Sequence, residues 1–205
     1  MSDFRRMFPK VETILLGAIF GGVFPILCFL AGWWGSIPFV SESTIKYYAL
    51  GGLLVGIVID VLFLGRWLVN AYRLNLIWMA VIYLFYSVGL YGFFMGVPVF
   101  NFLMGLFAGY YMGLRTQEEQ RTPAEAEQIF KRTGFFTSFI MAIVCCASIW
   151  LAATDPTTAT NINGMFALKQ PLSREVILAL SGIGGIALVV LEFFITRAMA
   201  RRAYR

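Results

Sequence analysis

The chain has 205 residues, of which 60% are hydrophobic and 13% are charged, and its formal net charge is +5. It contains no histidine, which excludes His-ligated metal or haem, His-based catalytic triads and a histidine proton relay. Apolar runs of about 20 residues, the signal of membrane-spanning helices, recur along the sequence. The basic residues lie at the ends of these runs, so the positive charge does not indicate a nucleic-acid partner.

The apolar runs predict an all-α fold, an integral membrane bundle of six transmembrane helices that forms a single domain over residues 1–205. The first run follows a basic N-terminus but is too long for a secretory signal peptide, so we count it as a span. The predicted spans cover about residues 11–34, 45–65, 76–95, 98–114, 135–153 and 174–196.

Glycine marks both the start and one face of the fourth span. Gly96 can adopt the left-handed conformation that ends a helix, and Pro98 suits the first turn of the next one. Gly105, Gly109 and Gly113 recur every four residues and therefore line one stripe of a helix. Small residues let membrane helices approach closely, so the stripe predicts a tight helix contact.

Between the fourth and fifth spans the sequence becomes polar. Thr122, Pro123 and Glu125 have the spacing of a capped helix start, with Pro at the first position and Glu at the third. Gly134 follows a basic pair and could end this helix. We therefore expect a short cytoplasmic surface helix over residues 123–132, which leads into the fifth span.

The basic residues also predict the orientation. Six spans put both termini on one side of the membrane, and thirteen of the 16 Lys and Arg residues lie on that side. Because cytoplasmic loops carry the excess of positive charge, we expect both termini in the cytoplasm. The membrane would be a plasma membrane, of the prokaryotic inner-membrane kind.

Two carboxylates lie within the spans, each near the predicted inner end. Asp60 shares a helix stripe with small residues of the second span, and Glu192 does so in the sixth, so each should face another helix. One interpretation is a structural ion pair that fixes helix register, for example between Asp60 and Arg66. The other is an inner gate in which the carboxylates, alone or sharing a proton, bind a proton or cation.

A second polar group combines Tyr83, Ser87 and Tyr91, spaced four residues apart on the third span, with Asn101 at the start of the fourth. An amide that faces lipid would leave its hydrogen-bonding groups unpaired. These residues either form hydrogen bonds between helices or line a ligand-binding cavity in the outer half of the bundle.

No catalytic constellation is present in the sequence. Serine nucleophiles have no histidine partner, no lysine lies in the interior of a span, and neither a phosphate loop nor a metal-ligand spacing occurs. The three cysteines lie in apolar runs without a C-x-x-C spacing. We therefore predict neither a cofactor nor a metal, and the sequence gives no reason to expect an enzyme.

The resulting functional prediction is a transport-type module that binds a small, neutral or weakly polar solute between its helices. The alternative is a non-catalytic accessory or scaffold subunit of a membrane complex, whose glycine stripes dock against a partner. A third possibility is a membrane enzyme acting on lipid. The expected partners are the lipid bilayer and a membrane protein or a second copy of the chain.

Overall fold

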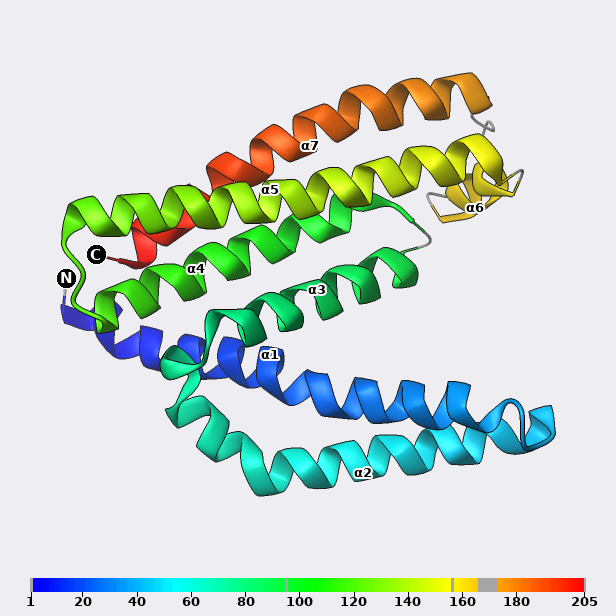
Figure 1. Cartoon of the computed structure of the whole chain (residues 1–205), viewed down its shortest axis with the longest axis horizontal. Coiled ribbons are helices and arrows are strands. Elements are labelled where there is room, and N and C mark those ends of the chain that lie inside the picture. The colour runs from blue at the N-terminus through cyan, green and yellow to red at the C-terminus, as the bar shows by residue number, and fades with distance from the viewer. Residues whose placement is uncertain (1, 95, 156, 166–172, 205) are drawn as a thin grey trace. The chain divides into compact units, whose positions relative to one another are not determined.

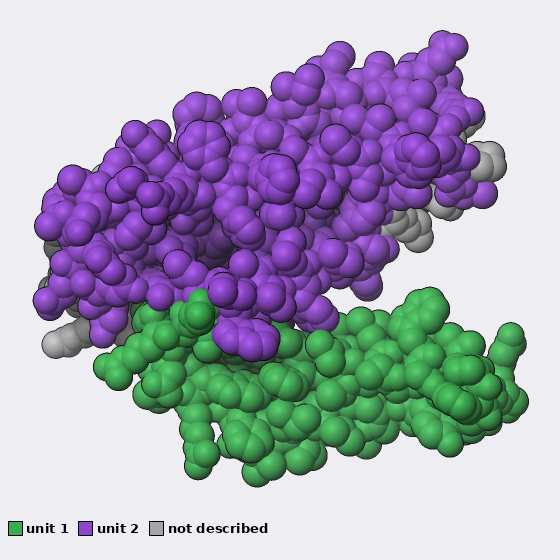
Figure 2. All heavy atoms as spheres, viewed as in Figure 1, with its two compact units in different colours: residues 1–75 green, residues 76–205 purple. Residues whose placement is uncertain are grey.

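The computed structural model describes residues 2–94, 96–155, 157–165 and 173–204, and over these residues the chain is helical with no strand (Figure 1). The chain divides into two compact units, Met1–Asn75 and Leu76–Arg205 (Figure 2). Unit 1 contains α1 (Ser2–Ser36), α2 (Glu42–Val69) and the 3-10 turn η1 (Ala71–Arg73). Unit 2 contains α3 (Leu76–Phe93), the 3-10 turn η2 (Pro98–Asn101), α4 (Phe102–Glu118), α5 (Pro123–Thr154), α6 (Thr158–Met165) and α7 (Arg174–Ala203).

Five of these helices contain segments that are long and apolar enough to cross a membrane: Glu12–Ser36, Glu42–Val69, Leu76–Phe93, Pro123–Thr154 and Arg174–Ala203. The helical prediction is therefore confirmed for the segments assigned to those five spans. The fourth predicted span is also helical, but it is divided between η2 and the 17-residue helix α4. Membrane crossing by these helices stays a prediction, as does the side of the membrane on which the termini lie.

Unit 1 is a pair of helices joined by a short turn, and α1 packs along α2 (Figure 1). Glycine allows the two backbones to come together. A Cβ atom at Gly52 of α2 would lie 2.1 Å from the carbonyl oxygen of Cys28, and one at Gly32 of α1 would lie 2.4 Å from that of Tyr48. Any larger residue at these positions would force the helices apart.

In unit 2, α4, α5 and α7 lie side by side (Figure 1). The contact between α4 and α7 again depends on glycine, because a Cβ at Gly109 would lie 2.2 Å from the Thr196 carbonyl oxygen, and one at Gly113 would lie 2.3 Å from that of Ala200. The contact between α5 and α7 is partly polar, since the hydroxyls of Thr137 and Thr196 are 3.0 Å apart and both residues are fully buried.

The connection from α3 to α4 has the features that its glycine and proline predicted. Gly96 has a φ angle of +81°, which confirms the predicted left-handed conformation. Pro98 lies in the first turn of η2, also as predicted. The Ser148 hydroxyl of α5 donates a hydrogen bond of 2.7 Å to the Gly96 carbonyl oxygen, which fixes this connection to the long helix.

Residues 123–132 are helical as predicted, but the predicted helix end after them is wrong, because they form the first turns of one continuous helix, α5, which runs to Thr154. The helix start is correct: Thr122 and Glu125 form a capping box, with Pro123 in the first turn. Gly134 does not end the helix. It packs against α7, where a Cβ would lie 3.0 Å from the Phe193 ring. A glycine inside a helix costs only about 1 kcal/mol, whereas a break would leave backbone groups without partners.

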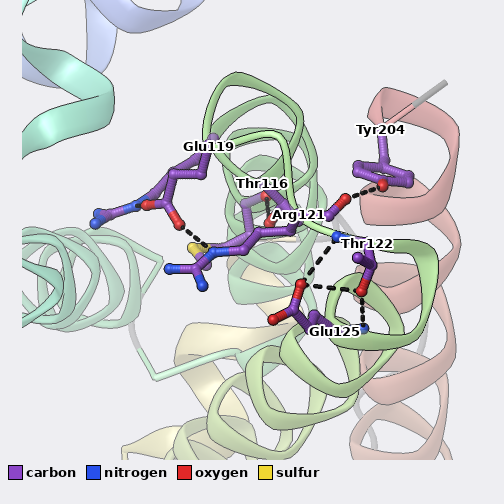
Figure 3. A network of polar contacts seen from close by, with 8 residues as sticks. Thr116, Glu119, Arg121, Thr122, Glu125 and Tyr204 are labelled. Carbon is purple, nitrogen blue, oxygen red and sulfur yellow. Dashed lines mark hydrogen bonds and ion pairs between the residues drawn. The ribbon is translucent and has the colours of Figure 1, made fainter.

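A polar network joins the end of α4 to the start of α5 and reaches the end of α7 (Figure 3). Glu119 accepts hydrogen bonds from the guanidinium groups of Arg115 at 2.9 Å and Arg121 at 3.1 Å. The Tyr204 hydroxyl donates to the Arg121 carbonyl oxygen. The hydrogen bond from Arg115 is the largest cause that holds the pKa of Glu119 below its usual value.

Candidate functional site

Glu192 of α7 is the most deeply buried acidic residue described, with an exposed fraction of 0%. Its Oε1 atom accepts a hydrogen bond of 3.3 Å from the Tyr83 hydroxyl of α3. Its Oε2 atom, equally buried, has no hydrogen-bond partner among the described residues. Burying a carboxyl group of which only one oxygen is hydrogen-bonded costs free energy, and such groups are rare in folded proteins.

Gly105 of α4 provides the space that the Glu192 carboxyl group occupies. A Cβ atom at Gly105 would lie 2.3 Å from Oε1, 2.5 Å from Cδ and 2.7 Å from Oε2. The carboxyl group therefore lies directly against the α4 backbone. Any side chain at residue 105 would displace it.

Ser87 and Asn101 extend the polar region by one helical turn toward the α3–α4 connection. Ser87 follows Tyr83 by four residues in α3, and Asn101 precedes Gly105 by four residues. The Asn101 amide nitrogen donates a hydrogen bond of 2.8 Å to the Ser87 carbonyl oxygen, and both residues are buried. Asn101 Oδ1 has no partner within the described part of the chain, whereas the Ser87 hydroxyl interacts with that of Tyr83.

We refer to Tyr83, Ser87, Asn101, Gly105 and Glu192 as the Glu192 cluster. The sequence suggested two separate groups, a ligand-binding group on the third and fourth spans and an inner gate that included Glu192. The structure connects them, because Tyr83 of the first group donates to Glu192 of the second. Three helices of unit 2 therefore contribute to one buried polar region.

Tyr91 lies away from this hydrogen-bonded region, beside the α3–α4 connection. Its hydroxyl oxygen would be 3.3 Å from a Cβ at Gly96. The hydroxyl is buried and has no hydrogen-bond partner in the ranges that the structure describes. Of the four residues predicted to bind a ligand, Tyr83, Ser87 and Asn101 are thus brought together, whereas Tyr91 is not.

Asp60 belongs to unit 1 and is described with that unit. It lies on α2 one turn after Gly56, with an exposed fraction of 7%, opposite Gly21 of α1. Its Oδ1 atom has no hydrogen-bond partner among the described residues. Arg66 is exposed, and the two side chains form no ion pair within unit 1 as described.

Other polar contacts of α7 were not identified from the sequence. Glu127 of α5 binds two arginines of α7: its Oε1 accepts a hydrogen bond of 2.6 Å from Arg197, and its Oε2 accepts one of 2.8 Å from Arg201. The acidic residue at position 127 and the basic residues after position 196 were visible as charges, but no spacing rule connects two helices that are 70 residues apart.

The donor set of the Glu192 cluster limits its chemistry. It offers hydroxyl, amide and carboxyl oxygens, which suit hydrogen bonding or proton binding. Among the residues that could be searched, no group of three His, Cys, Asp or Glu side chains could hold a metal ion. Comparisons with protein-family models, curated protein sequences and solved structures gave no match.

Proposed function

We propose that the protein is a transport-type membrane protein that binds a small, neutral or weakly polar solute at the Glu192 cluster. The observation that carries this proposal is a pair of buried oxygen atoms that have no hydrogen-bond partner among the described residues: Asn101 Oδ1 and Glu192 Oε2. Buried polar atoms are nearly always hydrogen-bonded in folded proteins. A solute that carries hydroxyl or amide groups could satisfy these oxygens, and its removal would leave them unsatisfied.

The apolar helices support the membrane part of the proposal. Large apolar side chains are exposed along the helices of both units, for example Leu54 and Val61 in unit 1 and Ile183 and Ile186 in unit 2. Such surfaces suit contact with lipid rather than water. The distribution of basic residues favours an orientation with both termini in the cytoplasm of a plasma or prokaryotic inner membrane. In this orientation Asp60 lies toward the inner end of α2 and Glu192 toward the inner end of α7.

The proposal is tested by ligand-dependent thermal stability of the full chain in detergent. Sugars, amino acids, nucleosides and small amides would be screened singly, because a solute that binds only the folded state stabilises it by about 2.7 kcal/mol at 100 times its Kd. Asn101→Ala removes an amide of the cluster, and Tyr48→Phe is a matched control at an exposed position in unit 1. We expect a stabilising solute whose effect is lost in Asn101→Ala and kept in Tyr48→Phe.

A solute found in this way would then be tested for uptake into proteoliposomes. Uptake by the wild type, reduced in Asn101→Ala, supports transport through the cluster. A thermal effect of equal size in Asn101→Ala and the wild type contradicts binding at this position. A protein that binds none of these solutes and copurifies from membranes with a second membrane protein would favour the accessory-subunit alternative.

A further inference from the structure

Among the described residues of unit 2, no positive charge pairs with the Glu192 carboxyl group. The ion pairs of the described residues involve Glu119 and Glu127, and Glu192 takes part in none of them. Its only hydrogen-bond donor in the described chain is the neutral Tyr83 hydroxyl, at 3.3 Å. An isolated carboxylate buried in apolar surroundings is so costly in free energy that the neutral form replaces it.

Among the described residues, none of the helices that pack against Glu192 brings a positive charge to it. From α3, the titratable group is Tyr83, whose ring packs against Phe136 of α5 at 5.4 Å. From α5, Cys145 is close enough to interact electrostatically with Glu192. From α4, Gly105 contributes only backbone. On α7 itself, the nearest charged side chain along the helix is Arg197, which Glu127 already binds.

The count of hydrogen-bond donors and acceptors around Glu192 also indicates that the carboxyl group carries a proton. Glu192 Oε2 and Asn101 Oδ1 are both acceptors without donors in the described structure. A proton on Oε2 would convert this oxygen into a donor and remove the negative charge at the same time. The carboxyl group itself lies directly against the α4 backbone, since a Cβ at Gly105 would be only 2.7 Å from Oε2.

We propose that Glu192 is a proton-binding site, which holds its proton while α3, α4 and α7 are packed and releases it when water enters. On release, the O–H bond at Oε2 breaks, the electron pair stays on the oxygen and the proton passes to water. Packing of α7 against Gly105 is thereby linked to proton binding. The role of this proton as the coupling ion of transport rests on the proposed function, whereas the site itself does not.

The proposal is tested by infrared spectroscopy of the full chain in phosphatidylcholine liposomes, without any solute. A protonated carboxyl group has a C=O stretching band that a carboxylate lacks. We expect this band to persist at pH values where an ordinary Glu is ionised. Glu192→Gln should remove it, whereas Asp60→Asn, which changes the buried acid of unit 1, should keep it. Tyr83→Phe should shift the band, because it removes the hydrogen bond to Oε1.

The Tyr83→Phe shift keeps the test decisive if Glu192→Gln does not fold. A band that disappears from the wild type at neutral pH, or one that neither Glu192→Gln nor Tyr83→Phe changes, would overturn the proposal. A sodium-dependent loss of the band at constant pH would also overturn it, since the site would then bind a metal cation. Because no solute is present, failure of solute binding leaves this result unaffected, and the two proposals fail separately.

Discussion

The carboxyl group of Glu192 on α7 lies in the space that a side chain at residue 105 of α4 would occupy, and a Cβ at Gly105 would come within 2.3 Å of its Oε1. The close packing of α4 against α7 therefore needs a glycine at position 105 wherever an acid occupies position 192, although the two residues are 87 positions apart in the sequence. This relationship connects the packing of unit 2 to its candidate site, because a change at either residue alters both.

Gly105→Ala should move Glu192 and destabilise unit 2. Overpacking a well-filled contact costs about 1–3 kcal/mol, and we expect a fall of this size in the free energy of unfolding, measured by thermal or denaturant unfolding in detergent. The infrared band assigned to Glu192 should shift in the same variant. An unchanged stability together with an unchanged band would show that Glu192 does not lie against α4.

Gly109→Ala tests the backbone contact between α4 and α7 separately from the acid. The new Cβ would lie 2.2 Å from the Thr196 carbonyl oxygen, which cannot move without its helix. We expect a loss of stability at least as large as that of Gly105→Ala. The control is Gly182→Ala on α7, where nothing lies within 4 Å, so that the alanine should leave stability equal or higher, by up to about 1 kcal/mol. Equal effects of the two variants would contradict the α4–α7 contact.

The ion pairs of Glu127 should make the stability of unit 2 depend on pH. The hydrogen bond from Arg201, and then that from Arg197, hold the pKa of Glu127 below its usual value. A lowered pKa in the folded state stabilises the protein above the ordinary carboxyl pKa, and this contribution is lost as the pH falls through the lowered pKa. Because the group is partly exposed, the effect should not exceed about 1 kcal/mol.

The measurement is the thermal midpoint as a function of pH for the wild type, Glu127→Gln and Glu118→Gln. Glu127→Gln should be less stable than the wild type near neutral pH and should approach it on acidification. Glu118→Gln removes an exposed acid from the same region and serves as the control for net charge. A stability difference for Glu127→Gln that grows at low pH would show that the arginines do not bind this carboxylate.

Thr122→Ala should weaken the start of α5, because Thr122 accepts a hydrogen bond from the Glu125 backbone and completes a capping box. Loss of such a cap costs about 1 kcal/mol, and hydrogen exchange should increase in the first turn of α5. Ser41→Ala is a matched control, since Ser41 occupies the same position before α2 without a side-chain cap hydrogen bond. Similar losses in both variants would argue against the capping box.

The sequence predicted most of the helices because apolar runs and helix-ending residues act locally. Gly96 and Pro98 marked the α3–α4 connection correctly, and Thr122 with Glu125 marked the start of α5. The error was to treat Gly134 as a helix end. A glycine can end a helix or let another helix approach, and only the position of Phe193 shows that here it does the second.

The sequence indicated which individual residues of the candidate site share a helix face, but not how the helices bring them together. Four-residue spacing related Tyr83 to Ser87 and Asn101 to Gly105, because it follows from helix geometry. The hydrogen bond from Tyr83 to Glu192 could not be predicted, since sequence spacing does not say which helices are neighbours. For the same reason the pairing of Arg197 with Glu127 was not foreseen.

The enclosure of Glu192 is the feature on which the account depends most, and its reactivity measures that enclosure directly. Membranes containing the full chain would be treated with a water-soluble carbodiimide and a nucleophile, and the modification of each carboxyl group would be followed by mass spectrometry. We expect rapid modification of the exposed Glu118, and modification of Glu192 only after the protein is unfolded. Modification of Glu192 in folded protein at the rate of Glu118 would contradict the account.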